Sequence, residues 1–496
     1  MNISFIQKAK ILKKNYSSLS SSLDCLFIVP PSPVPAGSQL LRHLLTLSPL
    51  GIGYLISILR QHGFTAEGLN LYTGLSDISK LILYFSKVKP KIIGFSTMTE
   101  NFLNGIELAK LCKKVLPNSI IIFGGPHVSF LDEETLKTGA VDCVVRGEGE
   151  ITIVELCNCL LKNSSSLYEI PGISFLSNSH IQRTPRRHFI TNLSDLPFPE
   201  RNIKDLDGNI PEWGRGVLVT SRGCPNKCKF CAAAGMSGGH YRLTSVERIM
   251  EEIAYLEQSG VIKKNIPLLF ADNTVTGDTN RLLEFCNVLK NKYIKWSAES
   301  RVDIITPVIV DAMKEAHCVG LQFGVESGSQ EVLEYAQKNI TLKQVESAVK
   351  LTARANIPVI CSFMIGLPWD TCESIKVTLD FALKLEEKYN VGILMGATVP
   401  YPGTYIHHHC DKLKVKIITK NYNLYHNLNP IMDTSTLTHE QIREFLYDAL
   451  FKIYNSMPNK YLDAFSKIVK YSLYQQGYAT FSYSDAPDKQ IITKYG

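Results

Sequence analysis

Short apolar runs alternate with amphipathic segments in the N-terminal third of the chain. One amphipathic segment, residues 49–61, has apolar residues at positions i, i+3, i+4 and i+7, which predicts a helix packed against a core. Strands that alternate with helices predict an α/β fold, in which a parallel sheet is doubly wound with helices on both faces. We place this domain at residues 23–165. The strand candidates are the apolar runs at residues 25–29, 91–97, 119–123 and 142–145.

A second series of apolar runs and helical segments fills residues 214–409. One of its helical segments begins with Thr244 and Glu247, a spacing that predicts a capping box. Six strand–helix units indicate an open, partial (βα)6 barrel, because the closed barrel of this type has eight. The strand candidates are residues 216–221, 266–271, 294–298, 321–325, 359–365 and 393–399.

Three further segments flank or connect these two domains. Residues 1–22 are rich in Lys and Ser and predict a loosely ordered basic tail, although an organelle transit peptide has a similar composition. Residues 166–213 contain several prolines and two short alternating apolar runs, which predict a linker with a small hairpin. Residues 410–496 have a helical period and predict a helical C-terminal cap, in which Thr438 and Gln441 form a second capping box.

Composition and charge narrow the class of protein. Hydrophobic residues make up 45% and charged residues 20% of the chain, as in ordinary globular proteins. No apolar run reaches the ~18 residues of a membrane-spanning helix, and no secretory signal is evident, so we expect a cytoplasmic protein. The net charge of +7 is spread along the chain without a basic–aromatic stripe, and no nucleic-acid partner is expected.

Three of the thirteen cysteines are clustered, and the number in a long chain without a secretory signal does not indicate a disulfide scaffold. Cys224, Cys228 and Cys231 are spaced C-x3-C-x2-C directly after the first strand candidate of the barrel. Such a loop can wrap three thiolates around one [4Fe–4S] cluster and leave one iron open for chemistry. A zinc site would normally be closed by a fourth Cys or His; that site and chance spacing are the alternatives. The basic residues that would offset the charge of a cluster are Arg222, Lys227 and Lys229.

With this cysteine loop the barrel resembles the radical SAM superfamily. An aromatic residue, Phe230, precedes the last cysteine, and residues 323–329 (Phe-Gly-Val-Glu-Ser-Gly-Ser) are similar to the family's strand that contacts S-adenosylmethionine (SAM). Other segments that resemble the family are residues 296–303, 363–368 and 400–404.

The resemblance implies that the open iron binds SAM and that one electron from the cluster cleaves it to methionine and a 5′-deoxyadenosyl radical. The protein would orient and shield this chemistry, and an electron donor such as flavodoxin or ferredoxin is the implied partner. By position in the family pattern, Phe230 lies near the adenine. Each polar candidate alone is equally compatible with a satisfied side chain of the barrel interior. The further candidate SAM contacts are Asp272, Glu299, Arg301, Glu326, Ser327 and Gly328.

Glycine-containing loops follow the strands of the first domain. The segment 124–129 (Gly-Gly-Pro-His-Val-Ser) follows a strand candidate, and glycines there let a bulky ligand approach the backbone. A plain strand-to-helix turn is the alternative. In sequence, these loops resemble the Rossmann-like cobalamin-binding domain that is often fused ahead of radical SAM barrels. The candidate cobalamin contacts are Ser96, Thr97, Gly124, Gly125, Pro126, His127, Ser129, Gly147 and Glu148.

The chain departs from the common cobalamin pattern at the cobalt ligand. It lacks the D-x-H-x2-G motif by which many cobalamin proteins supply a histidine, and we expect His127 to line the pocket of the nucleotide tail instead. Many fused radical SAM enzymes also lack the motif, so cobalamin is still expected, with a degenerate domain as the alternative. For the run of residues 407–410 (His-His-His-Cys), a solvated helix start and a second metal site are the two interpretations.

The resemblance implies a cobalamin-dependent radical SAM methyltransferase, which methylates an unactivated carbon through methylcobalamin. One alternative keeps both cofactors but performs a cyclisation or rearrangement without methyl transfer. Another is a non-catalytic cobalamin or iron–sulfur sensor. The substrate would be a small, lipid-like or peptide molecule, and the sequence does not distinguish these.

Overall fold

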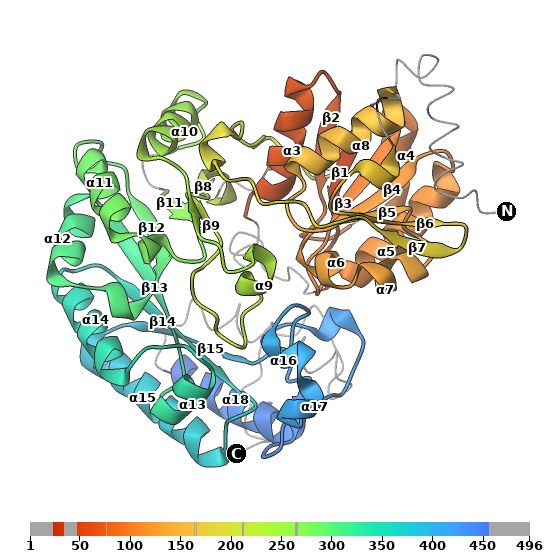
Figure 1. Ribbon diagram of the computed structural model, residues 1–496. Coiled ribbons are helices and arrows are strands. Elements are labelled where there is room, and N and C mark those ends of the chain that lie inside the picture. The colour runs from red at the N-terminus through yellow and green to blue at the C-terminus, as the bar shows by residue number, and fades with distance from the viewer. Residues whose placement is uncertain are drawn as a thin grey trace. The chain divides into compact units, whose positions relative to one another are not determined.

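The computed structural model describes residues 23–33, 47–75, 77–162, 164, 166–210, 213–262 and 266–455. The predicted tail at 1–22 and residues 456–496 of the predicted C-terminal cap lie outside this part. The described residues form two compact units (Figure 1). Residues up to Arg215, together with Asn421–Asn423, form the first unit, and Gly216–Lys420 with the residues from Leu424 onward form the second. No helix in the described ranges is long and apolar enough to cross a membrane.

The first unit is built on a seven-stranded sheet with the order β2-β1-β3-β4-β5-β6-β7. Strands β1 to β5 are parallel, as the alternation of strands and helices predicts, and β6 and β7 run antiparallel to their neighbours. The strands are β1 (Cys25–Val29), β2 (Ala66–Asn70), β3 (Ile92–Ser96), β4 (Ile120–Gly124), β5 (Cys143–Val145), β6 (Ile173–Ser177) and β7 (His180–Arg183).

Helices cover both faces of this sheet (Figure 1). Helices α3 and α8 pack together on one face, where Ile56 and Leu156 are fully buried. On the other face, the α5 side chain Phe102 lies 6.4 Å from Phe123 of β4, measured between ring centroids. The helices are α3 (Leu50–Gln61), α4 (Ile78–Val88), α5 (Phe102–Val115), α6 (Pro126–Phe130), α7 (Asp132–Lys137) and α8 (Glu150–Lys162), with 3-10 turns η2 (Leu167–Glu169) and η3 (Leu193–Asp195).

The hairpin expected in the 166–213 linker is formed by β6 and β7, and it is part of the sheet. Strand β6 pairs with β5, and this pairing covers backbone groups that an edge strand would leave exposed. Asn178 and Ser179 form the turn, both with positive φ (49° and 65°), as a two-residue hairpin turn requires.

The second unit contains a six-stranded parallel sheet with the order β15-β14-β13-β12-β11-β8. Strands β8 and β15 are its two edges, so the barrel is open. The predicted α/β class, a doubly wound parallel sheet followed by a partial (βα)6 barrel, is confirmed. The strands are β8 (Val217–Leu218), β11 (Leu268–Phe270), β12 (Trp296–Ser300), β13 (Cys318–Glu326), β14 (Val359–Ile365) and β15 (Gly392–Ala397).

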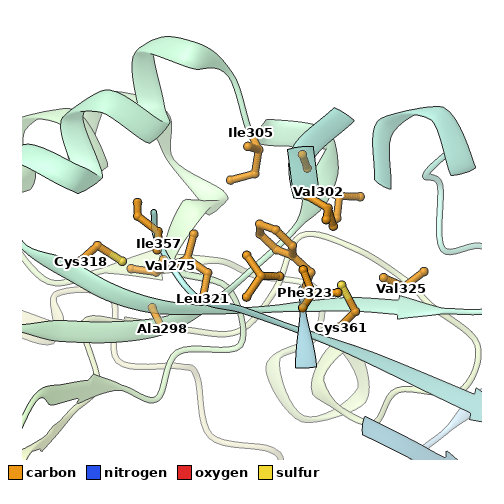
Figure 2. Close-up of a cluster of buried hydrophobic side chains, with 14 of the residues drawn as sticks. Val275, Ala298, Val302, Ile305, Cys318, Leu321, Phe323, Val325, Ile357 and Cys361 are labelled. Atoms are coloured by element: carbon orange, nitrogen blue, oxygen red, sulfur yellow. The ribbon is translucent and has the colours of Figure 1, made fainter. Parts of the chain in front are cut away.

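Helices α10, α11, α12, α14 and α15 follow the outer side of this curved sheet (Figure 1). Figure 2 shows part of the core between them, in which Phe323 of β13 lies near Val302, Leu321 and Cys361. The helices are α9 (Ala233–Ser237), α10 (Val246–Gln258), α11 (Thr279–Leu289), α12 (Pro307–Glu315), α13 (Gln330–Tyr335), α14 (Leu342–Arg354), α15 (Cys372–Tyr389), α16 (Tyr405–His408), α17 (Cys410–Leu413) and α18 (His439–Asn455).

Of the two expected capping boxes, one is confirmed and one is wrong. Thr438 and Gln441 exchange the two side-chain-to-backbone hydrogen bonds of a capping box. At α10, however, the N-cap is Ser245, whose hydroxyl accepts from the Arg248 N–H. Thr244 precedes the N-cap by one residue. Its own N–H donates to the Thr220 carbonyl and is therefore not available to the Glu247 side chain.

The expected helical C-terminal cap also contains strands. Two short strands, β16 (Lys416–Ile417) and β17 (Met432–Asp433), pair antiparallel before α18 begins. Helix α18 then packs against β15, with Ile442 and Leu446 buried in the barrel core. The described part of this segment is therefore continuous with the barrel.

Candidate active site

The cysteine loop follows β9 (Ser221–Arg222), at the carboxyl end of the first barrel strand. Within the loop, Cys231 donates its N–H to the Cys228 carbonyl at 3.1 Å. Lys229 between them donates its N–H to the Ala336 carbonyl at 3.0 Å and accepts the Ile406 N–H at 3.2 Å. The middle of the loop is therefore held by two other segments of the barrel. Cys231 is exposed and the other two thiols are partly exposed.

The three thiols differ from the cysteines of the core. Core thiols such as Cys286 and Cys361 are buried, and burial raises the pKa of each to about 12. Burial also raises the pKa of Cys228, but the nearby cations Lys338 and Arg301 oppose this change. Burial likewise raises the pKa of Cys231, so the positive charge that favours a thiolate lies beside Cys228.

The three thiols are not gathered as closely as the ligands of a preformed single-ion site. Among the described residues, the only three metal-binding side chains whose ligand atoms all lie within 4.8 Å of one another are Asp433, His439 and Glu440. The three cysteine sulfurs do not all lie within this distance of one another. Two N–H groups already point at sulfur: Ala233 donates to Cys231 Sγ at 3.4 Å and the Asn226 side chain to Cys224 Sγ at 3.6 Å.

Residues 407–410 do not bring three ligand atoms within 4.8 Å of one another in the part of the chain that the structure describes. His409 uses Nδ1 on the Tyr405 carbonyl, one helical turn away. In the Asp433 group, Asp433 accepts the His439 N–H, and the two ring nitrogens of His439 each lie 2.7 Å from a carboxylate oxygen, of Asp433 and of Glu440.

A buried ion pair lies at the carboxyl end of β13, next to the cysteine loop. Glu326 has a φ of 76°, and its Oε1 lies 2.7 Å from Lys338 Nζ. The Lys338 ammonium is also 5.9 Å from the Phe230 ring centroid. Phe230 itself packs on a small apolar cluster that includes Leu367. The structure thus brings Glu326 and Phe230 together through a lysine that sequence reasoning missed.

The guanidinium of Arg301 forms hydrogen bonds to other residues of the protein. Its Nε and Nη2 donate to the two carboxylate oxygens of Asp303 at 2.9 and 3.0 Å, and Nη2 also donates to the Lys338 carbonyl at 3.0 Å. This contact fixes the turn that carries Lys338. Gln337 and Asn339, on either side of Lys338, both have positive φ.

Ser327 and Gly328 are docked against α15. Ser327 is fully buried, and its hydroxyl lies 3.1 Å from that of Thr378. Gly328 donates its N–H to the same hydroxyl at 2.9 Å, and an added Cβ there would lie 2.7 Å from the Thr378 Cα. Glycine is therefore required at this position by helix packing.

Glu299 faces the side of the sheet opposite the core. Its neighbours Ala298 and Ser300 are buried, whereas Glu299 is exposed, so it points into the open side of the barrel. Partial desolvation raises the pKa of Glu299, and the nearby Glu326 raises it further.

Asp272 follows β11 and is buried, with 2% of its surface exposed. Its Oδ1 accepts the N–H groups of Thr220 and Ser221, both at 2.7 Å, and its Oδ2 accepts the Thr220 hydroxyl. Burial raises the pKa of this carboxyl, while the hydrogen bond from Thr220 opposes the change.

In the first unit, the predicted loops meet at the carboxyl ends of β3, β4 and β5. Gly125 has a φ of 103°, and an added Cβ would lie 2.5 Å from the Thr97 carbonyl oxygen. Ser129 ties two loops together, since its hydroxyl donates to the Gly125 carbonyl at 2.8 Å and accepts the Gly147 N–H at 2.9 Å. Around Gly147 a Cβ would meet nothing within 4 Å. Open space beside glycine backbone fits a bulky ligand at this edge.

Four other candidates of the first unit are less open. His127 is 1% exposed and its ring centroid lies 4.2 Å from that of Phe102, so the histidine is part of the core. Glu148 accepts the Ile190 N–H at 2.9 Å. Pro126 is the first residue of α6, where its missing N–H costs nothing. Ser96 ends β3, with the backbone of Gly124 as its partner in β4.

Two family models match the chain. The radical SAM superfamily model matches residues 218–382, and the B12 binding domain model matches residues 43–157. A protein of Pyrococcus horikoshii described as an uncharacterized methyltransferase is 33% identical over 439 residues, covering 86% of this chain and 92% of that protein. The anaerobic magnesium-protoporphyrin IX monomethyl ester cyclase of Cereibacter sphaeroides is 23% identical, covering 79% of this chain and 65% of the cyclase.

The fold is shared with a solved structure. The cobalamin-dependent S-adenosylmethionine radical enzyme OxsB, with aqua-cobalamin bound, aligns with a TM-score of 0.68 and 19% identity, covering 94% of this chain and 72% of OxsB. The chain is thus an enzyme of the radical SAM superfamily. Within that superfamily it belongs to the proteins that carry a B12-binding domain, the family of the Pyrococcus horikoshii methyltransferase. Its cofactors are a [4Fe–4S] cluster, SAM and cobalamin.

Proposed function

We propose that this enzyme methylates an unactivated carbon of its substrate, with Cys224, Cys228 and Cys231 as the three ligands of the cluster. The observation that carries the proposal is the set of accessible thiols on one loop, beside buried cations, in a chain that also has a B12-binding domain. When bound, the cluster supplies the electron that cleaves SAM to a radical, and cobalamin carries the methyl group.

The residues of the barrel bind and orient in this proposal. Phe230 offers an aromatic surface within the cysteine loop, and Lys338 offers a positive charge next to this ring. Glu299 presents a carboxylate on the open side of the sheet. Arg301 and Ser327 have positioning roles, because their own polar atoms already form hydrogen bonds to other residues of the protein.

The glycine loops of the first unit would bind cobalamin. Gly124 and Gly147 leave room for a flat, bulky ligand against the backbone, and Thr97, Gly125 and Ser129 hold the loops in place. His127 would support this wall from within the core.

The substrate is a small, lipid-like or peptide molecule in this proposal, and a flavodoxin- or ferredoxin-type protein supplies electrons. All thirteen cysteines are free, which fits a reducing compartment such as the cytoplasm. The similarity to the anaerobic cyclase favours one second candidate, a ring-forming reaction with the same cofactors.

The test starts from anaerobic protein reconstituted with iron, sulfide and hydroxocobalamin. We expect about four irons and one cobalt per chain, and formation of 5′-deoxyadenosine after SAM and a reductant are added. When candidate substrates are added, a product that is heavier than its substrate by one methyl group supports methyl transfer. Cleavage of SAM with a product that has lost hydrogen but gained no methyl would support the cyclase instead. A reduced cluster that cleaves no SAM would contradict both.

A further inference from the structure

The carboxylate of Asp272 accepts hydrogen bonds from a segment that is distant in sequence and lies directly before the cysteine loop. Thr220 and Ser221 lie between β8 and Arg222, where the chain turns into the loop. We propose that Asp272 is a positioning residue, which fixes the start of the cysteine loop and makes no contact with SAM. The inference rests on the proposed function for its meaning, since the loop matters only if it binds the cluster.

Both carboxylate oxygens of Asp272 accept hydrogen bonds from other residues of the protein. Oδ1 accepts two backbone N–H groups at 2.7 Å each, and Oδ2 accepts the Thr220 hydroxyl. The side chain is almost completely buried. A carboxylate that contacts a cofactor needs an accessible oxygen, and Asp272 has its oxygens turned toward the loop.

Arg281 of α11 supports the same segment from the other side. Its Nη1 donates to the Thr220 carbonyl and its Nη2 to the Thr220 hydroxyl, both at 3.1 Å. Thr220 is thus held through its N–H, its carbonyl and its hydroxyl. The positive charge of Arg281 also offsets the buried charge of Asp272.

A second restraint acts on the next residues. Ser221 and Arg222 pair with Leu243 and Arg242 in a short antiparallel ladder. Gly223 has a φ of 91°, and an added Cβ would collide with the His240 carbonyl oxygen. The direction of the chain is therefore set from residue 220 up to the residue before Cys224. The ladder holds the strand, and Asp272 holds the turn that leads into it.

Substitution by asparagine separates positioning from cofactor contact. In Asp272→Asn, the amide oxygen can accept the same two N–H groups. The amide nitrogen can only donate, so the bond with the Thr220 hydroxyl reverses its direction. The two bonds to the backbone are kept and the charge is lost. Asp272→Ala removes all three bonds, and Thr220→Val removes the two bonds of the hydroxyl, to Asp272 and from Arg281, while it keeps both backbone N–H bonds.

The first measurement is hydrogen exchange on the full chain without metal. We expect the backbone amides of Thr220 and Ser221 to exchange at least about tenfold faster in Asp272→Ala than in the natural protein, and to be unchanged in Asp272→Asn. If Asp272→Ala does not fold, Thr220→Val should still raise exchange at the same amides. Unchanged exchange in every folded variant that removes a bond would overturn the proposal. This result is independent of whether the protein cleaves SAM.

The second measurement is made on reconstituted protein. Asp272→Asn should keep the iron content, the electron paramagnetic resonance spectrum of the reduced cluster and its change on adding SAM. Asp272→Ala should hold several-fold less iron or give a broadened spectrum. Loss of the SAM-induced change in Asp272→Asn, with protected amides, would overturn the proposal and make Asp272 a SAM contact. Failure of the natural protein to bind a cluster would reject the proposed function and leave the exchange result standing.

Discussion

The ammonium of Lys338 and the carboxylate of Glu326 form an ion pair at 2.7 Å, with only 9% and 10% of the two side chains exposed. The backbone around the pair is unusual, because Glu326, Gln337 and Asn339 all have positive φ. Each such non-glycine conformation costs about 1 kcal/mol. Conformations of this kind persist where the surrounding structure enforces them, which is common at functional sites.

Lys338→Met should destabilise the second unit by about 3–5 kcal/mol, because it leaves the Glu326 carboxylate buried without a partner. The double variant Lys338→Met, Glu326→Gln should recover most of this loss. The matched control is Lys388→Met, which breaks an exposed pair with Glu346 and should change stability little. Urea unfolding of the three variants measures the difference. Equal losses for Lys338→Met and Lys388→Met would show that the buried pair has no special role.

Cys228→Ala should abolish cluster-dependent SAM cleavage and leave the first unit folded, since it removes one of three proposed ligands. Cys372→Ala is the control, because Cys372 is also accessible but lies at the start of α15. Iron content and 5′-deoxyadenosine formation report the outcome. Retained cleavage in Cys228→Ala would reject the ligand assignment.

The strands show which parts of the fold the sequence predicts well. Strands β1 and β14 are found at the predicted residues, because β1 is buried at every position and β14 buries every second apolar residue in the barrel core. Strand β2 was not predicted, because its sequence Ala-Glu-Gly-Leu-Asn has one strongly apolar residue and its place at the sheet edge demands no more. The single strand expected at 216–221 is divided into β8 and β9, since Thr220 turns toward Asp272.

Gly124→Ala and Gly125→Ala should differ in their effect on the stability of the first unit. At Gly124 a Cβ would lie no nearer than 3.8 Å to another atom, so the fold should be unchanged. At Gly125 the positive φ and the Thr97 carbonyl oppose any side chain, and we expect a loss of at least about 2 kcal/mol. Thermal unfolding and cobalamin titration measure both effects. Weaker cobalamin binding by folded Gly124→Ala supports the predicted site, and full binding would place cobalamin elsewhere.

Asp370, in the loop after β14, should make stability depend on pH. Burial raises its pKa from 3.8 to about 6, so the folded protein keeps the proton to higher pH than the unfolded chain does. The stability contributed by the protonated form is therefore lost as pH rises from about 4 to 6, by on the order of 2–3 kcal/mol. Asp370→Asn should stabilise the cofactor-free protein more at pH 7 than at pH 4.5 in urea unfolding. The same difference at both pH values would contradict this cause.

The sequence predicts a cluster-binding loop, but it does not predict the contacts that the structure shows around that loop. The three cysteines could be proposed as cluster ligands because their spacing alone is typical of a metal-binding loop. Asp272 and Arg301 lie at strand ends, where polar residues often contact a cofactor. Instead they form hydrogen bonds with Thr220 and Lys338, which are distant in sequence. Lys338 was missed because nothing in its neighbouring residues distinguishes a buried lysine from an exposed one.

The β6–β7 hairpin has a consequence for the newly made chain. The five parallel strands are complete once Val145 has left the ribosome, but the hairpin that covers β5 ends only at Arg183. At ~5–20 residues per second, β5 stays an unprotected edge for a few seconds. A neighbouring nascent chain can pair with such an edge. Substitutions that destabilise the turn at Asn178 and Ser179 would leave this edge uncovered after synthesis as well, and should lower the yield of soluble protein during expression.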